Sequence, residues 1–284
     1  MKTGVVFEGG AVRTVYSCGV MDAWIEQGID FDYLVGVSAG IAYGTSFISR
    51  QFGRNLEILT KYAGDSRYMS FRNMVRPGNR GCYFGLKFAF EEIPFKHVPF
   101  DYEAFARWPG VAEAVVTDIE TGLAQYIPLD LSDPNTNLLE ASCAMPVLFP
   151  IFDVNGMKVL DGGCTDAIPW RRALEAGCDR VVVVLTRERG YIRREESLQA
   201  LFEWKYRRYP KFIEMMHHRV EKFNADRAEM FRAEREGRLL VLAPDATEGF
   251  SRTERDVAKI RGLWRQGYGH ATVREAEIRE YLHG

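Results

Sequence analysis

The first fifty residues alternate between short apolar runs, glycine-rich turns and helical patterns, and this alternation restricts the possible fold most. The apolar run Thr3–Phe7 ends at two glycines and is followed by a helical pattern over Val12–Gln27. The next apolar run is Tyr33–Val37, and a second helical pattern extends from Ile41 to about Phe52. Strands that alternate with helices predict an α/β fold in which helices flank a mostly parallel central sheet.

The rest of the chain repeats these patterns around one irregular segment. Residues 64–100 are rich in Arg, Gly and aromatic residues, and we expect Pro77, Pro94 and Pro99 to break any regular element there. Strands are predicted at Glu113–Asp118, Leu123–Pro128, Lys158–Leu160 and Arg180–Thr186, the first two as a hairpin, and helices at Asn135–Ala144 and Trp170–Gly177.

The composition changes after residue 186. Residues 187–236 hold 13 basic and 10 acidic residues, and Phe212, Met216, Val220 and Phe223 are spaced for one face of a long helix. Residues 238–243 are again apolar and predict a strand that rejoins the main sheet. We therefore expect an α/β domain over residues 1–186 and a mainly helical extension over residues 187–284.

The overall charge and the cysteines exclude several classes of protein. The 37 Lys and Arg against 39 Asp and Glu leave a net charge of −2, which argues against a nucleic-acid-binding protein. Five cysteines without a CxxC pair argue against a disulfide framework and a structural zinc site. The cysteine usage indicates a reducing setting and no long apolar run predicts a membrane span, so we expect a cytoplasmic protein. No zinc spacing or calcium loop appears, so we expect no metal or other cofactor.

A GxSxG pattern, Gly36-Val37-Ser38-Ala39-Gly40, lies directly between a predicted strand and a predicted helix. A nucleophilic serine at such a sharp turn needs glycines on both sides, because neighbouring side chains would clash. The alternative is an ordinary turn in which Ser38 caps the helix that follows.

The glycine loop before the first helix reads Glu8-Gly9-Gly10-Ala11-Val12-Arg13. Amides of consecutive small residues at a helix N-terminus can bind an anion or the oxyanion of an acyl-transfer intermediate, and Arg13 could fix the loop. A dinucleotide site would require GxGxxG, whereas the chain reads GGAVRT, and the second strand ends in Ser38 rather than an acid. A plain tight turn remains the other alternative.

A nucleophilic serine also needs a base. The five histidines have no convincing sequence setting, and a GxSxG turn after a single strand comes too early for an α/β-hydrolase. Asp161 ends a predicted strand and precedes two glycines, which would let its carboxylate approach a serine hydroxyl. The alternative for Asp161 is a simple Asp-Gly β-turn.

Together, the glycine loop, the GVSAG turn and the Asp-Gly-Gly block after ASCAMPVLFP resemble the patatin-like phospholipases. The charged C-terminal part, including GLWRQGYGHA, resembles the extension of a bacterial cytosolic subgroup of that family. The resemblance implies a three-layer α/β sandwich and a Ser–Asp dyad without histidine. It implies the following roles: Ser38 as nucleophile, Asp161 as base, Gly9, Gly10, Ala11 and Ala39 as oxyanion donors, and Arg13 as support for the loop.

Two residues depart from the family pattern, because Ala11 and Thr14 stand where glycine is usual. We expect Ala11 to keep a negative φ, so a loop that needs a positive φ would be distorted. The resemblance implies a lipid acyl hydrolase of the phospholipase A or lysophospholipase type. The alternative is a weakly active or inactive fold that binds lipid or a protein partner.

Two basic and aromatic segments could contact lipid. Within residues 67–80, Arg72 and Arg76 are candidate ligands for a phosphate headgroup, and Arg80 belongs to the same segment. The segment Lys205–Lys211 could touch a membrane surface peripherally. The alternatives are a solvated loop and a solvated helix end.

Overall fold

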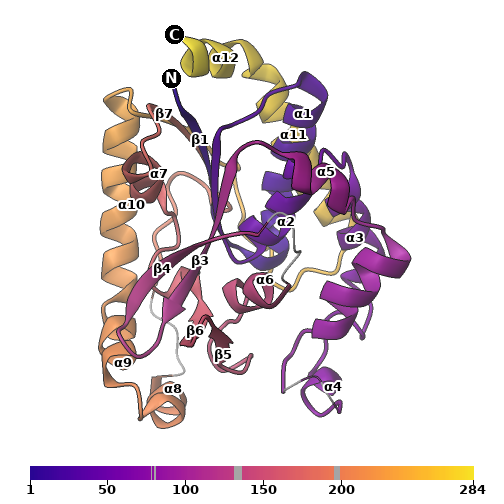
Figure 1. The fold of residues 1–284 in the computed structure, drawn as a ribbon, viewed down its shortest axis with the longest axis vertical. Helices are drawn as coiled ribbons and strands as arrows, with labels where there is room; N and C mark the ends of the chain where they lie inside the picture. The colour runs from indigo at the N-terminus through magenta and orange to yellow at the C-terminus, as the bar shows by residue number, and fades with distance from the viewer. Residues whose placement is uncertain (78, 80, 131–135, 195–198) are drawn as a thin grey trace.

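Within residues 1–77, 79, 81–130, 136–194 and 199–284, which the computed structural model describes, eight strands form one mixed sheet (Figure 1). The strands are β1 (Thr3–Phe7), β2 (Tyr33–Val37), β3 (Val111–Asp118), β4 (Leu123–Pro128), β5 (Phe152–Val154), β6 (Met157–Asp161), β7 (Arg180–Val184) and β8 (Leu239–Leu242). The order is β5-β6-β3-β2-β1-β7-β8, with β4 also paired to β3. The run from β3 to β8 is parallel, whereas β4, β5 and β6 join by antiparallel pairing.

Helices cover both faces of this sheet, which makes the three-layer α/β arrangement expected from the sequence. The helices and helical turns are η1 (Ala11–Thr14), α1 (Val15–Gln27), α2 (Ala39–Ile48), α3 (Arg54–Tyr62), α4 (Phe71–Met74), η2 (Lys87–His97), α5 (Tyr102–Arg107), α6 (Thr136–Ser142), η3 (Gly162–Cys164), α7 (Trp170–Glu175), α8 (Gln199–Tyr206), α9 (Pro210–His217), α10 (Arg219–Arg235), α11 (Val257–Val273) and α12 (Glu275–His283). No helix in the described ranges is both long and apolar enough to cross a bilayer.

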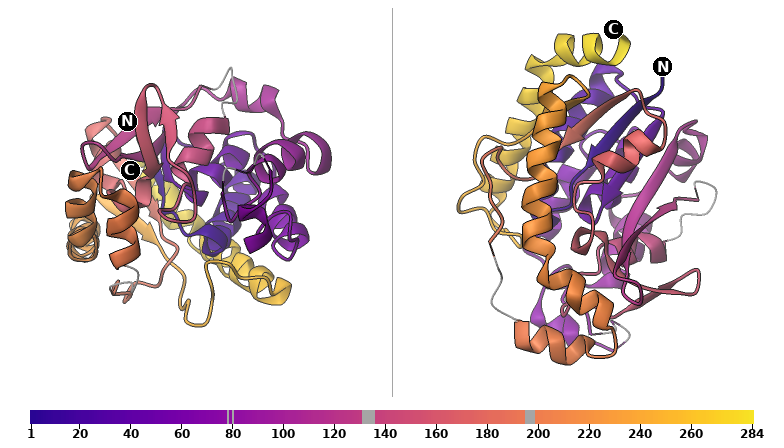
Figure 2. Two further views of the ribbon diagram at one scale, coloured as in Figure 1. Left: turned by 90° about the horizontal axis from the view of Figure 1, so that it is seen from below. Right: turned by 90° about the vertical axis from the view of Figure 1, so that its left-hand side faces the viewer.

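Successive residues of the central strands point into two different cores. Val5 and Phe7 of β1 pack in the core that includes residues of α1, α2 and α11. Val6 of β1 and Val35 of β2 pack in the other core, beneath α7 and α10, which face the viewer in the right-hand view of Figure 2. Burial on both faces explains why these strands read as continuous apolar runs in the sequence.

The first and the last long helices, α1 and α11, cross in direct backbone contact. A Cβ atom at Gly19 would lie 2.1 Å from the carbonyl oxygen of Trp264, and one at Gly267 would lie 2.0 Å from that of Tyr16. The indole N–H of Trp264 also donates a hydrogen bond to the carboxylate of Asp22 at 2.8 Å. The C-terminal region is therefore packed tightly against the helix that follows the glycine loop.

The sheet register brings the ends of two distant strands, β2 and β6, to neighbouring residues of β3, on its two opposite sides. Val37, the last residue of β2, is paired with Val115, and Asp161, the last residue of β6, is paired with Val116. Because β2 and β6 meet neighbouring residues of the same strand, Ser38 and Asp161 emerge close together. They are separated by more than 120 residues of sequence, so this proximity is a product of the tertiary fold.

Two expectations for secondary structure are wrong. The segment 64–100 is not irregular throughout, since it contains α4 and η2, and Pro94 lies inside η2. This helix ends with a wide turn in which the N–H of Val98 bonds to the carbonyl of Ile93 at 2.8 Å. Proline at residue 94 lacks a backbone N–H, so the helix continues through this position with one hydrogen-bond donor missing.

The long helix expected over residues 212–223 is divided into α9 and α10 at His218. Phe212 packs in the core shared with α1, whereas Phe223 packs in the core beneath α7. The regular spacing of apolar residues thus reflects two short helices that serve different cores, not one continuous face.

Candidate active site

Ser38 lies at the sharp turn between β2 and α2 in a strained backbone conformation. Its φ is 55° and its ψ is −130°, a combination that L-residues rarely adopt. A Cβ at Gly36 would lie 2.7 Å from the backbone nitrogen of Ile41, and one at Gly40 would lie 2.4 Å from the carbonyl oxygen of Phe7. Ser38 occupies the N-cap position but its side chain makes no capping hydrogen bond. The hydroxyl is therefore not engaged in capping the helix.

The Asp161 carboxyl lies near that hydroxyl, since the Ser38 side chain is one of the groups that lower the pKa of Asp161. The N–H of Asp161 donates to the carbonyl of Ala144 at 2.9 Å, and its carbonyl accepts from the Thr117 hydroxyl at 2.9 Å. The N–H of Gly163 donates to the carboxylate at 2.7 Å. The carboxylate is therefore fixed at its backbone and at one oxygen.

Burial raises the pKa of the Asp161 carboxyl above its ordinary value. The hydrogen bond from Gly163, the nearby Ser38 side chain and the positive charges of Arg219 and Arg252 oppose this rise to a smaller extent. A carboxylate with a raised pKa is a better proton acceptor than a solvated aspartate, and it is still ionised once the pH exceeds that pKa.

Ser142 fixes the backbone of the Ser38 turn through two hydrogen bonds. The backbone N–H of Ser38 donates to Oγ of Ser142 at 2.9 Å, and the Ser142 hydroxyl donates to the carbonyl of Val115 at 2.8 Å. Ser142 was not singled out from the sequence. Only its place in the ASCAMPVLFP block, which contributed to the resemblance, pointed towards it.

The glycine loop lies directly against Ser38. A Cβ at Gly9 would lie 2.9 Å from Cβ of Ser38, and one at Gly10 would lie 2.7 Å from Oγ1 of Thr186. Among the described residues, the amides of Gly9, Gly10, Ala11 and Ala39 donate no hydrogen bond. These N–H groups are therefore available to an oxyanion formed beside Ser38.

Ala11 adopts a φ of 51°, so the expectation of a negative φ there is wrong. The left-handed region costs an alanine about 1 kcal/mol, which the fold around the loop must offset. The next amide, that of Val12, donates to the carbonyl of Arg252 at 3.1 Å and holds the loop from the C-terminal region. Thr14 has a φ of −61°, which does not require glycine.

Arg13 is buried behind the loop among other cations. Burial, followed by the charges of Arg187 and Arg252, lowers its pKa to about 10, while Glu8 acts in the opposite direction. Glu8 itself accepts a hydrogen bond from the backbone N–H of Thr186 at 2.6 Å. Nε of Arg13 is buried without a hydrogen-bond partner among the described residues, so support of the loop by Arg13 stays a prediction.

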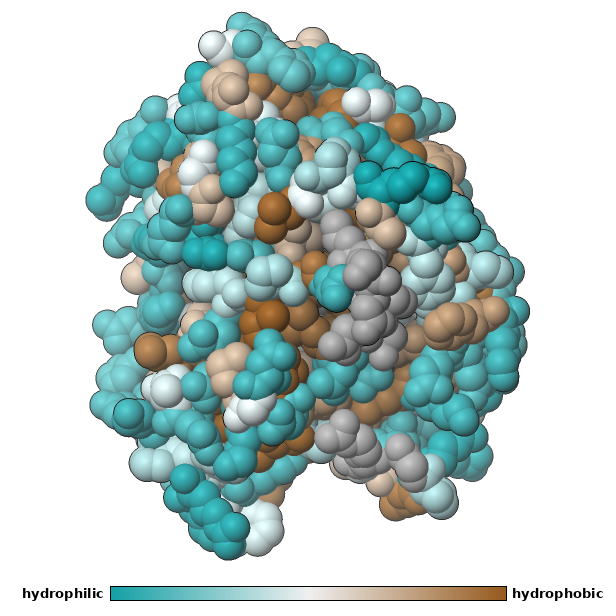
Figure 3. Space-filling view, viewed as in Figure 1, coloured by the Kyte–Doolittle hydropathy of each residue, from teal (hydrophilic) through white to brown (hydrophobic). Residues whose placement is uncertain are grey.

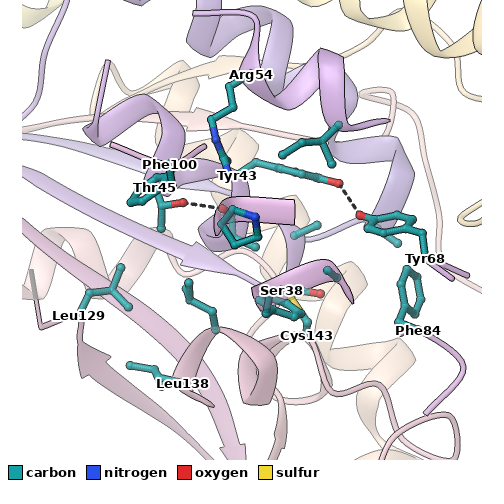
Figure 4. Close-up of a pocket in the computed structure, with 18 of the residues that line it drawn as sticks. Ser38, Tyr43, Thr45, Arg54, Tyr68, Phe84, Phe100, Leu129, Leu138 and Cys143 are labelled. Atoms are coloured by element: carbon teal, nitrogen blue, oxygen red, sulfur yellow. Dashed lines mark hydrogen bonds between the residues drawn. The ribbon is translucent and has the colours of Figure 1, made fainter. Parts of the chain in front are cut away.

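Ser38, Ala11 and Ala39 line an apolar cavity of about 170 Å³. Figure 4 shows Ser38 beside Cys143, with Arg54 on the wall opposite Leu138. Most of the remaining lining is apolar or aromatic and includes Val12, Ala42, Tyr43, Ile58, Tyr68, Phe84, Phe90, Phe100, Phe105, Leu129, Leu139, Met145 and Phe149. Such a cavity next to a nucleophile suits a hydrocarbon chain better than a polar substrate.

Two polar residues of the cavity have no signal in the sequence. Burial raises the pKa of the Cys143 thiol, which therefore stays protonated, and the nearby Ser38 side chain acts in the opposite direction to a smaller extent. Burial lowers the pKa of Arg54 to about 10, and its guanidinium donates to Oγ of Ser46 at 3.0 Å and lies 5.0 Å from the ring centre of Phe100. Their roles become visible only when distant segments come together.

The candidate headgroup ligands lie elsewhere. Arg72 and Arg76 are exposed and do not line the cavity, and Arg80 lies outside the described residues. Within the described parts of the chain, no histidine lines the cavity either. His270, for example, is hydrogen-bonded to the hydroxyl of Tyr16 at 2.9 Å, where α11 crosses α1.

The C-terminal region also reaches the loop after Asp161. Arg219, at the start of α10, donates from Nε and Nη2 to the carbonyl of Gly163 at 3.2 and 3.0 Å. The N–H of the same Gly163 holds the Asp161 carboxylate. One arginine of the C-terminal region thus acts on the base through a single residue.

Comparisons with known proteins find one curated relative and one similar solved structure. The chain is 26% identical over 189 residues to the uncharacterized protein YjjU of Escherichia coli K12, a match that covers 65% of the chain and 52% of YjjU. The chain thus spans about half the length of this curated relative. The crystal structure of VipD from Legionella pneumophila is similar with a TM-score of 0.42 and 14% identity, over 96% of the chain and 67% of VipD.

Family models match two parts of the chain. Residues 209–283 match a domain of unknown function, DUF6363. Residues 5–174, which include the glycine loop, Ser38 and Asp161, match the model of the patatin-like phospholipases. Since this second match covers more than half of the chain, the protein belongs to the patatin-like phospholipase family.

Proposed function

We propose that this protein is a serine acyl hydrolase that cleaves carboxylic esters of phospholipids or lysophospholipids. The observation that carries the proposal is the position of Ser38, which lies near the buried Asp161 carboxyl and lines an apolar cavity. The free amides of the glycine loop beside it are the second support. The family relationship supports a lipid ester as the substrate.

In the proposed reaction, Oγ of Ser38 attacks the ester carbonyl while Asp161 accepts the hydroxyl proton. The carbonyl oxygen becomes an oxyanion, which the N–H groups of Gly10, Ala11 and Ala39 stabilise. Collapse of this intermediate breaks the bond to the alcohol, which leaves with the proton from Asp161. Water then attacks the acyl-enzyme, Asp161 takes its proton and returns one to Ser38, and a fatty acid leaves.

The acyl chain of the substrate would occupy the apolar cavity. Phe84, Phe149 and Leu138 lie on its walls, and burial of hydrocarbon against them contributes about 25 cal/mol per Å² of apolar surface removed from water. The neutral Cys143 thiol beside Ser38 adds no competing charge. Long-chain esters should therefore bind better than short-chain esters of the same alcohol.

The proposal is tested by labelling and product analysis. A fluorophosphonate should modify Ser38, identified by mass spectrometry, and the wild-type protein should release fatty acid from at least one member of a panel of phospholipids, lysophospholipids and neutral esters. The Ser38→Ala protein should show neither reaction while keeping the wild-type circular dichroism spectrum. Equal hydrolysis by both proteins would overturn the proposal.

A second candidate function is lipid binding without efficient turnover, and the strained backbone of Ala11 favours it. If the loop cannot hold its conformation when the oxyanion forms, the cavity would retain a fatty acyl chain without cleaving the ester. A fatty acid would then bind with the same affinity to the wild-type and Ser38→Ala proteins, with no labelling and no release of product.

A further inference from the structure

Two helices on either side of residues 145–149, α4 and α8, carry exposed apolar side chains on the protein surface. At α4, Phe71 is 76% exposed and Val75, directly after the helix, is 84% exposed. At α8, Leu201 is 46% and Trp204 is 66% exposed. We call these four residues the apolar rim. Large side chains of this kind in water are costly unless they meet a partner.

Both helices are attached to one loop of the cavity wall. On the α8 side, Lys205 donates from Nζ to the carbonyl of Val147 at 3.1 Å, and the N–H of Val147 donates to the hydroxyl of Tyr206 at 3.0 Å. On the α4 side, the N–H of Tyr83 donates to the carbonyl of Leu148 at 3.1 Å, and its ring lies 5.2 Å from that of Phe71. The rim therefore flanks residues 145–149.

This loop connects the rim to the cavity. Met145 and Phe149, at its two ends, line the cavity together with Ser38, and the ring of Phe149 stacks on that of Phe84. Figure 1 and the right-hand view of Figure 2 place α4 and α8 at the same end of the molecule. Apolar residues reach the surface among polar ones at this end in Figure 3.

The charges around the rim are mostly positive, although the chain as a whole carries −2. Arg72 and Arg76 lie exposed between and beside the rim residues of α4. Lys205, Arg207 and Arg208 surround Trp204, and the guanidinium of Arg207 lies 5.5 Å from the Trp204 ring. Glu203 is the one acidic residue among residues 199–209. Exposed apolar groups ringed by cations match the chemistry of an anionic lipid surface.

We infer that the apolar rim and its surrounding arginines dock this protein reversibly on an anionic phospholipid bilayer, with the cavity opening towards the lipid. The rim residues enter the boundary between headgroups and acyl chains, and the guanidinium groups meet the phosphates. The proposed function explains why the protein would dock on lipid, but docking itself requires no hydrolysis. Binding can therefore be measured with the Ser38→Ala protein.

The test uses sedimentation of the Ser38→Ala protein with phosphatidylcholine vesicles, with and without phosphatidylglycerol. We expect binding to the anionic vesicles, weaker binding to neutral vesicles, and a decrease in binding as salt is added. The double variant Phe71→Ser, Val75→Ser should weaken binding by about tenfold or more, because two apolar side chains no longer leave water. The matched control is Val273→Ser, which changes a residue that is 85% exposed at the end of α11, away from the rim.

Trp204 provides a second readout in the same samples. It is the most exposed tryptophan, since Trp24, Trp108 and Trp170 are buried and Trp264 is partly buried. Brominated lipid should quench its fluorescence on vesicle binding, and Trp204→Phe should remove most of that quenching. Quenching that persists in Trp204→Phe would overturn the proposed orientation.

Three results would overturn the inference. The protein could fail to bind anionic vesicles, or Val273→Ser could weaken vesicle binding as much as Phe71→Ser, Val75→Ser does. The third result is a dimer that depends on the rim residues and does not bind vesicles. The last result would assign the rim to a second copy of the chain. Hydrolysis of a water-soluble ester by the Phe71→Ser, Val75→Ser variant with an intact Ser38 separates the two proposals. If that activity stays at the wild-type level while vesicle binding is lost, docking and chemistry are distinct properties.

Discussion

The N-terminal and C-terminal regions contribute differently to the candidate site. Every group in the proposed reaction comes from residues 9–161, within the segment matched by the patatin-like model. The region 209–283 supplies contacts instead: the carbonyl of Arg252 accepts from Val12, and Arg219 binds the carbonyl of Gly163. One contact supports the glycine loop and the other supports the loop after Asp161. The segment matched by the patatin-like model is therefore held in place partly by a region of unknown function.

The largest effect should come from the base in the N-terminal region. Asp161→Asn keeps the size of the side chain but removes the proton acceptor, so kcat/KM should fall by about two to four orders of magnitude. Wild-type kcat/KM should rise with pH as Asp161 ionises, with a midpoint above the pKa of a solvated aspartate because burial raises it. The measurement is a pH profile with a monomeric ester substrate.

Stability provides the control for Asp161→Asn. A carboxyl whose pKa is higher in the folded than in the unfolded state binds protons more readily when folded, so its ionisation makes the wild-type protein less stable as the pH rises between the two values. The asparagine variant should therefore lose activity at neutral pH without losing resistance to urea. Unchanged activity would remove Asp161 from the mechanism.

An intermediate effect is expected from Arg219 of the C-terminal region. Arg219→Met removes two hydrogen bonds to Gly163 and a positive charge that lowers the pKa of Asp161. We expect kcat to fall by about tenfold, which corresponds to an increase of about 1.4 kcal/mol in the activation free energy when Asp161 is held less firmly. The pH profile should move to higher pH, because the removed positive charge no longer lowers the pKa of Asp161. Arg219→Lys should restore the position of the profile but only part of kcat.

Arg232→Met is the matched control on the same helix, since Arg232 is exposed further along α10. A similar loss of kcat in this variant would mean that α10 acts only through overall stability. A profile that stays in place in Arg219→Met would show that the arginine does not act on the base.

The smallest effect should come from the strained alanine of the glycine loop. Ala11→Gly relieves a φ of 51°, and the free energy of unfolding should increase by about 1 kcal/mol in urea titrations. Activity should change by less than about threefold if the loop already holds its conformation. Ala228→Gly, on the exposed side of α10, should instead decrease the free energy of unfolding by about 1 kcal/mol. Destabilisation by Ala11→Gly would contradict the strain at this position.

The sequence predicted the local elements of the central sheet well. The bounds of β1, β2 and β4 agree with the expected strands, because apolar runs there are bounded by glycine, proline or acidic turns. Pro94 misled the interpretation because its effect depends on which hydrogen bonds a helix actually uses. The break between α9 and α10 was not predicted, because regularly spaced apolar residues can pack in two different cores.

The candidate site was only partly predictable for a related reason. The turn around Ser38 is specified locally by Gly36 and Gly40, each of which meets backbone atoms where a side chain would not fit. The approach of Asp161 instead depends on the pairing of β6 with β3, and the nearness of Cys143 and Arg54 depends on the assembled cavity. Such relations join residues far apart in the chain and leave no pattern in a short window of sequence.

The glycine-to-backbone crossing of α1 and α11 has a consequence for biosynthesis. Residues 15–27 leave the ribosome long before residues 257–273. For most of translation, the apolar face of α1 is therefore not covered by α11. The support of the glycine loop through Arg252 and α11 forms only after this late segment emerges. The glycine loop would therefore reach its supported conformation only when synthesis of the chain is nearly complete.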